Sequence, residues 1–93
     1  MSTHAGVGIL MPDGSVEAVY CHHDGYLEYV GKLLFKYYNG TRLIKQLIGY
    51  GDFPSLKEIP GDIEFYGLRD SASATYTPDE FASAFSYNYV WVP

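Results

Sequence analysis

Residues 20–26, Tyr-Cys-His-His-Asp-Gly-Tyr, contain most of the side chains in this sequence that could do chemistry. A thiol, two imidazoles and a carboxylate at consecutive positions offer a metal site or a cysteine–histidine nucleophile. The spacing favours neither, because adjacent residues of a strand point to opposite faces and Cys21 and His23 would lie about 7 Å apart on one face. Cysteine is also often buried, and a buried thiol is inert. We therefore expect no metal ligand, no catalytic residue and no cofactor.

We interpret the segment instead as one side of a recognition pocket. The free N–H groups at the start of a helix favour anions, and this segment would lie at such a start. Arg69 could add a forked cation suited to phosphate or carboxylate. The alternative, which stays open, is that Asp24 only caps the helix and the histidines bond to local backbone. The predicted ligand-binding residues are His22, His23, Asp24, Tyr26 and Arg69.

A hairpin must bring the chain to this segment. Residues 6–11 and 16–22 have the composition of strands, and Pro-Asp-Gly-Ser at residues 12–15 is typical of the turn between them. Asp24 is then a natural N-cap for a helix over residues 25–38. On that helix Phe35 is predicted to face outward.

Two further helices and two further strands complete the expected fold. Thr41 can cap a helix over residues 41–50, and a proline-containing loop follows it. Residues 63–68 alternate as a strand does, and a polar connection leads from them to Thr77-Pro78-Asp79-Glu80, a helix start. Residues 87–92 are strongly β-prone. The order β-β-α-α-β-α-β predicts an α+β fold with one mostly antiparallel four-stranded sheet and two helices packed on one face.

Length and composition limit the possible classes of protein. The 93 residues predict a single domain over 1–93, and 47% hydrophobic content with 18% charged residues argues against disorder. The net charge of −5 disfavours general nucleic-acid binding. No apolar run approaches the ~20 residues of a membrane helix, so we expect no membrane partner. Residues 1–4 lack the basic start of a signal peptide, and the single cysteine suits a reducing cytosol.

The ten tyrosines exceed what a small core can hide. Tyrosine is enriched at recognition surfaces, because it offers a large contact area and a polar tip at little entropic cost. Tyr87, Tyr89 and Trp91 would share one face of the last strand. That face either lies under helices or is an exposed interface, including one between copies of a homo-oligomer.

Several stretches of this sequence resemble small uncharacterised proteins of tailed bacteriophages and prophages. Those proteins carry a segment close to Ile-Tyr-Cys-His-Trp-Asp-Gly-Tyr after a hairpin with an Asp-Gly turn. The similarity covers residues 19–26, 30–32, 47–56 and 69–70. This chain departs from them at His23, where tryptophan is usual, and at Phe53-Pro54 before Ser55.

The resemblance implies a phage or prophage origin and a location in the host cytoplasm, but it supplies no reaction. Small accessory phage proteins are often directed at host defence, and by this analogy we expect a non-catalytic binding protein that counteracts a bacterial defence system. Its partner would be a host defence protein, as for an anti-CRISPR inhibitor, or an anionic nucleotide that serves as an immune signal. The alternatives are a small Cys/His enzyme acting on a nucleotide and a structural homo-oligomeric phage protein.

Overall fold

Four strands form one mixed sheet in the computed structural model, which describes residues 3–93 apart from the side chains of Leu68 and Asp70. Met1 and Ser2, the beginning of the N-terminal stretch considered above, lie outside the described residues. The order across the sheet is β3-β2-β1-β4; β1–β2 and β2–β3 are antiparallel, and β1–β4 is parallel. The predicted α+β class with a mostly antiparallel four-stranded sheet is confirmed. The strands are β1 (Ala5–Leu10), β2 (Val16–Cys21), β3 (Ala74–Tyr76) and β4 (Tyr87–Trp91).

The predicted hairpin is confirmed, and its turn residues act as expected. The Asp13 carboxylate accepts hydrogen bonds from Ser15 N at 2.9 Å and from Ser15 Oγ at 2.6 Å. These bonds lower the pKa of the Asp13 carboxyl. Gly14 takes a φ of 89°, which a residue with a side chain rarely adopts. The strands then pair in a register that places Ala5 opposite Cys21.

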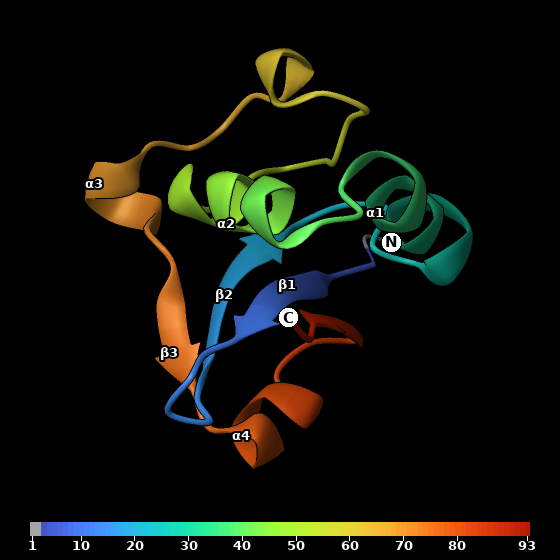
Figure 1. The fold of residues 1–93 in the computed structure, drawn as a ribbon. Helices are drawn as coiled ribbons and strands as arrows, with labels where there is room; N and C mark the ends of the chain where they lie inside the picture. The colour runs from blue at the N-terminus through green and yellow to red at the C-terminus, as the bar shows by residue number, and fades with distance from the viewer. Residues whose placement is uncertain (1–2) are drawn as a thin grey trace.

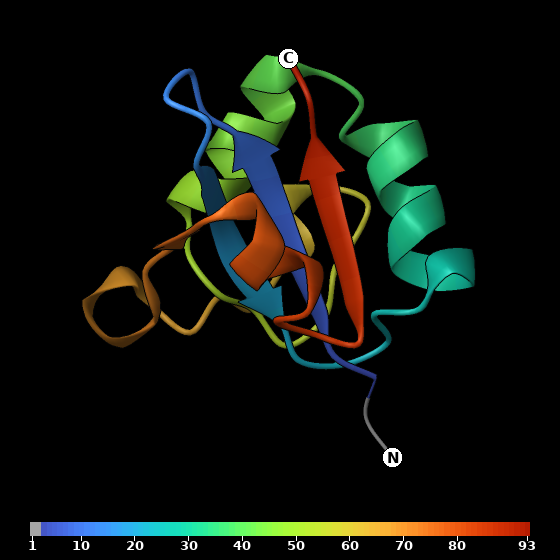
Figure 2. The ribbon, with the colours of Figure 1, turned by 90° about the horizontal axis from the view of Figure 1, so that it is seen from below.

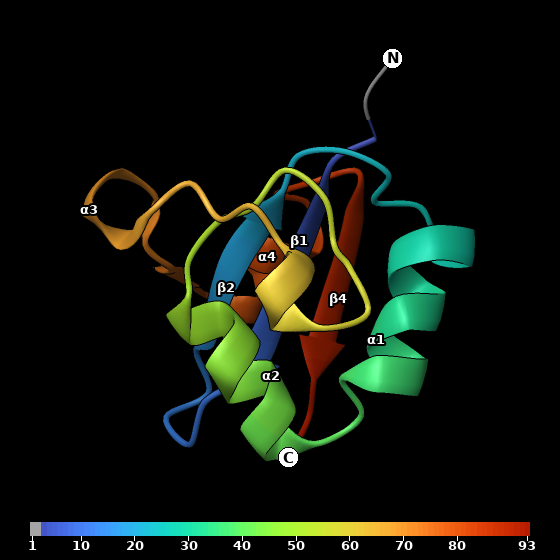
Figure 3. The same cartoon turned by 90° about the horizontal axis from the view of Figure 1, so that it is seen from above.

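Helices cover both faces of the sheet, as Figure 1 shows with α1 and α2 above the strands and α4 below them. α2 (Thr41–Gly49) lies across one face, and α1 (Lys32–Tyr37) lies on the same side beside β4 (Figure 3). The predicted packing of two helices on one face is therefore confirmed. α4 (Pro78–Ala82) lies on the opposite face (Figure 2).

Two hydrophobic cores result, one on each face. The smaller core joins Val16, Ala18 and Phe81 under α4. Gly6 permits this packing, because a Cβ at that position would lie only 2.5 Å from the Phe85 ring. The larger core lies between the sheet and the two longer helices; it includes Val7, Ile9, Val19, Val30, Tyr38, Ile44, Leu47 and Ile48.

The first predicted helix starts later than expected and without its predicted cap. It begins as a π-helical turn, η1 (Leu27–Gly31), and continues as α1. Asp24 is not the N-cap: its φ is 58°, and the cap position belongs to Tyr26, whose side chain makes no cap hydrogen bond. Phe35 faces outward, as predicted, with 77% of its surface exposed.

Close packing of Gly25 explains the delayed start. Its N–H donates to the Thr3 carbonyl at 2.9 Å, and a Cβ on it would lie 2.6 Å from the Ala5 Cβ. The chain therefore runs against the start of β1 before it can turn into a helix. A capping preference worth about 1 kcal/mol does not outweigh this tertiary contact.

The second predicted helix is confirmed as α2, although its predicted cap is wrong. Gly40 occupies the N-cap position, and no side chain caps it. The Thr41 hydroxyl instead accepts a hydrogen bond from Trp91 Nε1 at 2.8 Å. That bond ties the start of α2 to the end of β4.

The predicted strand at residues 63–68 is wrong, and β3 lies instead in the segment predicted to be a polar connection. Side chains do alternate between buried and exposed from Ile63 to Tyr66. The segment nevertheless forms no ladder; the Tyr66 N–H donates to the Asp52 carbonyl at 3.2 Å. The alternation of buried and exposed side chains thus belongs to a loop that covers the edge of the core. The strand that pairs with β2, at Val16–Ala18, is β3.

The predicted start of α4 is confirmed as a capping box. Thr77 Oγ1 accepts from Glu80 N at 3.1 Å, and the Glu80 carboxylate accepts from Thr77 N at 2.8 Å. The helix ends at Ala82. Asn88 holds the chain that follows, because its amide accepts from Phe85 N and donates to the Ala82 carbonyl, both at 3.0 Å.

The remaining helical segments are short. Within residues 3–93 no helix combines the length and the apolar character that crossing a bilayer requires. The remaining short helical segments are η2 (Pro60–Asp62), a 3-10 turn, and α3 (Leu68–Ser71).

Candidate functional site

The end of β2 carries polar side chains past the area that α4 covers. Val16 and Ala18 are buried under α4, whereas Tyr20 and His22, which follow them on the same face of the strand, are half-buried. A polar surface therefore begins where the smaller core ends.

Five ring side chains meet at this surface, and we call His4, Tyr20, His22, His23 and Tyr66 the imidazole–phenol cluster. The ring centres of His4 and His22 lie 5.2 Å apart, and those of His22 and His23 lie 4.3 Å apart with planes only 6° from parallel. The Tyr20 ring lies 5.4 Å from His22. His22 Nδ1 and the Tyr66 hydroxyl are 3.3 Å apart, within hydrogen-bond distance.

Tyr20 connects the cluster to the smaller core. Its hydroxyl shares a hydrogen bond with His4 Nδ1, and its ring stacks on Phe85 at 5.2 Å. Burial is the main cause that raises the pKa of Tyr20, and the nearby Tyr66, Cys21 and Asp52 raise it further. His4, Tyr20 and Phe85 also line a shallow hollow. The cluster thus combines aromatic faces with hydrogen-bonding groups, and its His4 and Tyr20 side of the surface is hollowed.

Asp52 holds the segments that carry the cluster. Its carboxylate accepts a hydrogen bond from Tyr20 N at 2.8 Å, and its own N–H donates to the Ser71 carbonyl at 2.7 Å. Its carbonyl accepts from the Tyr66 N–H. Partial burial raises the pKa of the Asp52 carboxyl, while the bond from Tyr20 N lowers it. Asp52 is therefore a positioning residue that joins the end of β2 to the loop bearing Tyr66.

The structure brings together two of the five residues predicted to form the pocket. His22 and His23 stack in the cluster. Asp24 is exposed in the turn after β2. Tyr26 is exposed at the start of η1, with its ring 6.4 Å from Tyr29. Arg69 is exposed on α3. The predicted rim at the helix start therefore becomes a surface at the end of β2.

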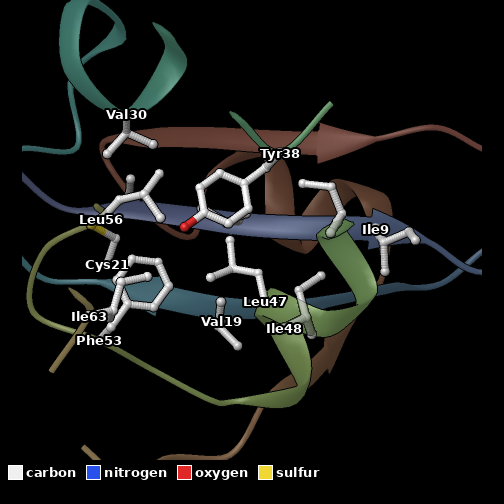
Figure 4. Close-up of a cluster of buried hydrophobic side chains, with 13 residues drawn as sticks. Ile9, Val19, Cys21, Val30, Tyr38, Leu47, Ile48, Phe53, Leu56 and Ile63 are labelled. Atoms are coloured by element: carbon white, nitrogen blue, oxygen red, sulfur yellow. The ribbon is translucent and has the colours of Figure 1, made fainter. Parts of the chain in front are cut away.

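Cys21 points into the larger core, away from the cluster, as Figure 4 shows beside Leu56, Phe53 and Ile63. Its side chain has no exposed surface, and its Sγ donates to the His23 carbonyl at 3.2 Å. Burial raises the pKa of the Cys21 thiol to about 11. The His23 ring stacks on His22, so the expectation that Cys21 and His23 share a face is wrong. The thiol is a core group.

The described residues contain no group of three His, Cys, Asp or Glu side chains arranged to hold a metal ion. His4, His22 and His23 are neighbours through stacked rings, and the phenols of Tyr20 and Tyr66 lie beside them.

The aromatic face of β4 lies largely under the helices. Tyr89 and Trp91 pack against the larger core, and the Tyr89 hydroxyl donates to the Gly25 carbonyl at 2.8 Å. Burial is the largest cause that raises the pKa of Tyr89 to about 12. Tyr87 remains 41% exposed, with its ring parallel to that of Tyr89. Of the three residues predicted as an interface, Tyr87 therefore offers the most accessible ring.

Sequence reasoning missed His4, Tyr20 and Tyr66. The hairpin register would have revealed the first, because pairing Ala5 with Cys21 places His4 opposite His22 one step further. Tyr20 follows from the two-residue repeat of β2. Tyr66 had no local signal, since a loop held by Asp52 brings it to the cluster.

The cluster can stack on a planar group and exchange hydrogen bonds with it through imidazole nitrogens and phenol oxygens. It presents no thiol, since Cys21 faces the other side of the sheet. No protein-family profile, curated protein or solved structure matches this chain.

Proposed function

We propose that this protein is a non-catalytic binding protein that captures an anionic nucleotide through the imidazole–phenol cluster. The observation that carries the proposal is the continuous set of rings formed by His4, Tyr20, His22 and His23. Purine and pyrimidine rings stack on aromatic side chains, with about 1–3 kcal/mol per base. Imidazole and phenol groups at the rim supply the hydrogen bonds that a phosphate or a base edge accepts.

The contacts of Tyr20 hold its ring in place before a ligand binds. The Tyr20 hydroxyl bonds to His4, and its backbone N–H bonds to the Asp52 carboxylate, so the central ring is held from two sides. Phe85 stacks beneath it. A surface whose side chains are already fixed loses less conformational entropy when a ligand binds.

The state of Cys21 supports binding rather than turnover. Nucleophilic catalysis needs a thiolate next to a base, whereas this thiol is buried with a raised pKa and donates to a backbone carbonyl. Without an activated nucleophile, capture is the activity that the cluster supports best.

The biological role that we propose rests on the resemblance to small phage and prophage proteins. A phage protein that sequesters a nucleotide signal in the host cytoplasm would counteract a bacterial defence system. An anti-CRISPR-like inhibitor that blocks a defence protein would use a protein-sized surface instead, and the test below separates the two.

Calorimetric titration of the purified chain with a panel of mononucleotides, dinucleotides and cyclic oligonucleotides tests the proposal. We expect saturable binding of at least one member. Tyr66→Ala and His22→Ala should weaken that binding roughly tenfold or more each, the effect of losing one stacking or hydrogen-bonding group from a small site.

Tyr26→Ala is the matched control, because Tyr26 is also an exposed phenol but lies at the start of η1. It should leave binding unchanged. Bound ligand released by denaturation should be chemically intact. A degraded nucleotide would favour the enzyme alternative, and no binding across the panel together with capture of one defined host defence protein would favour the inhibitor.

A further inference from the structure

The outer side of the first helix exposes large apolar side chains. Leu27 is 60% exposed and Phe35 is 77% exposed, two turns apart on the continuous helix formed by η1 and α1. Figure 3 shows that this helix lies at the margin of the molecule, beside the edge strand β4. A contiguous patch of exposed apolar side chains on a surface can serve as an interaction site.

A hollow lies between these two side chains, at Gly31. Gly31 has no side chain, and the wide π-helical turn carries Leu27 across it, since a Cβ on Gly31 would lie 2.5 Å from Leu27 Cδ1. The hollow is lined mainly by apolar surface of Leu27, Glu28, Gly31, Lys32, Phe35 and Lys36. A projecting ring and a hollow that can accept it therefore lie on one helix.

We propose that this helix pairs antiparallel with the same helix of a second copy, so that Phe35 of each copy fills the hollow around Gly31 of the other. A twofold axis near residue 32 does this, because it places position 35 opposite position 29, between Glu28 and Gly31, which both line the hollow. Each contact then occurs twice, as a closed homodimer requires. Side chains that insert between four residues of a facing helix are the usual packing of paired helices.

The charges at the rim fit the same axis. Position 28 lies opposite position 36, so Glu28 of each copy meets Lys36 of the other. Glu28 also lies one turn before Lys32 of its own helix, the favourable order for an ion pair. Both Lys32 side chains lie near the axis, where their long stems can carry the ammonium groups out to solvent. Lys36 Nζ lies 5.3 Å from the centre of the Tyr37 ring, at the edge of the pairing surface.

The expected association is weak. The helix offers three turns and two large apolar side chains, much less than the roughly 800 Å² per partner of a standard stable interface. Dimerisation should therefore depend on concentration, with a dissociation constant in the micromolar range or above. This inference does not rest on nucleotide binding, since the cluster lies at the end of β2.

Sedimentation velocity over a wide range of protein concentrations tests the pairing. The unchanged chain should shift from monomer to dimer as its concentration rises. Phe35→Glu should weaken dimerisation by at least roughly tenfold, because it places a charge in the hollow. Circular dichroism of each variant checks that the helix remains folded.

Charge reversal identifies the partner residues. Lys36→Glu should weaken dimerisation roughly threefold to tenfold, and Glu28→Lys combined with Lys36→Glu should restore it, because the exchanged pair attracts again. Ile59→Glu is the matched control: Ile59 is 56% exposed but lies in the loop before η2, so dimerisation should persist. A chain that remains monomeric at its highest soluble concentration overturns the proposal. So does a dimer that survives Phe35→Glu or that the double reversal fails to restore.

Discussion

The Tyr20 hydroxyl and His4 Nδ1 share a hydrogen bond between neighbouring strands, although sixteen residues separate them in the chain. Gly6 pairs with Tyr20 and Ala5 with Cys21, so His4 continues β1 alongside the end of β2. The bond joins the first described residues to the centre of the imidazole–phenol cluster. It also supplies the half-buried phenol with a partner, which a polar group on a partly covered sheet face needs.

Tyr20→Phe should remove this bond while keeping the ring that stacks on Phe85. We expect the free energy of unfolding to fall by about 0.5–1.5 kcal/mol, the usual net value of one such hydrogen bond. Urea denaturation measures the change, and the imidazole NMR signals of His4 should move at the same time. Equal stability with unchanged His4 signals would show that the bond is not formed in solution.

Cys21 should resist alkylation as long as the protein is folded. A pKa of about 11 leaves roughly one thiol in a thousand ionised at pH 8, and core side chains cover the sulfur. Iodoacetamide treatment followed by mass spectrometry should find an unmodified native chain and a fully modified chain in denaturant. Rapid labelling of the native protein would place the thiol at the surface.

Alkaline pH should destabilise the fold through the buried phenol of Tyr38 and the half-buried phenol of Tyr89. Burial raises the pKa of Tyr38 and of Tyr89 to about 12, above the value near 10 of an unfolded tyrosine. The unfolded chain therefore loses these protons first, and stability that is present below pH 10 is lost as the pH rises toward 12. Urea denaturation at a series of pH values measures this fall. Tyr38→Phe should reduce the slope above pH 10, because it removes one of the two shifted phenols.

Gly6→Ala should destabilise the protein by about 1–3 kcal/mol, the usual cost of forcing extra volume into a packed core. The added methyl group would meet the rings of Phe85 and Phe81 at 2.5–2.7 Å. Gly61→Ala is the control, because nothing lies within 4 Å of a Cβ there. It should be neutral or stabilise the fold slightly by restricting the unfolded chain. Similar thermal unfolding curves for the two variants would show that α4 does not pack on β1 as described.

Local signals in the sequence predicted the parts of the fold that local contacts decide. The Asp-Gly turn of the hairpin and the Thr77–Glu80 capping box both form with the expected hydrogen bonds. In each case the interacting residues lie within three positions of one another. Neighbouring residues alone therefore supply the interaction, and the local preference agrees with the global fold.

The wrong predictions concern places where contacts between distant segments determine the local structure. Asp24 has the preference of an N-cap, yet the packing of Gly25 against Ala5 moves the helix start past it. Residues 63–68 alternate like a strand, yet they border the core without a partner ladder, and the short segment Ala74–Tyr76 takes the place beside β2. Preferences of less than ~1 kcal/mol per residue lose to such contacts.

Only part of the candidate site could be predicted from the sequence, because its residues come from segments that are distant along the chain. His22 and His23 were found because they are neighbours in a conspicuous segment. His4 required the register of the hairpin, and Tyr66 required knowledge of the loop that Asp52 holds. Tyr26 was assigned from an assumed helix start, and the actual start lies two residues later. Arg69 was assigned from its place after the predicted strand at residues 63–68, which does not form.

The parallel pairing of β1 with β4 has a kinetic consequence. Ala5 pairs with Tyr87, 82 positions further along the chain, whereas β1 and β2 meet across a short turn. Closing a loop of that length costs more chain entropy than closing the turn, and contacts with such high sequence separation slow folding. The hairpin is thus suited to form early, while the edge strand docks late and leaves one side of β1 open to misplaced strands until it arrives.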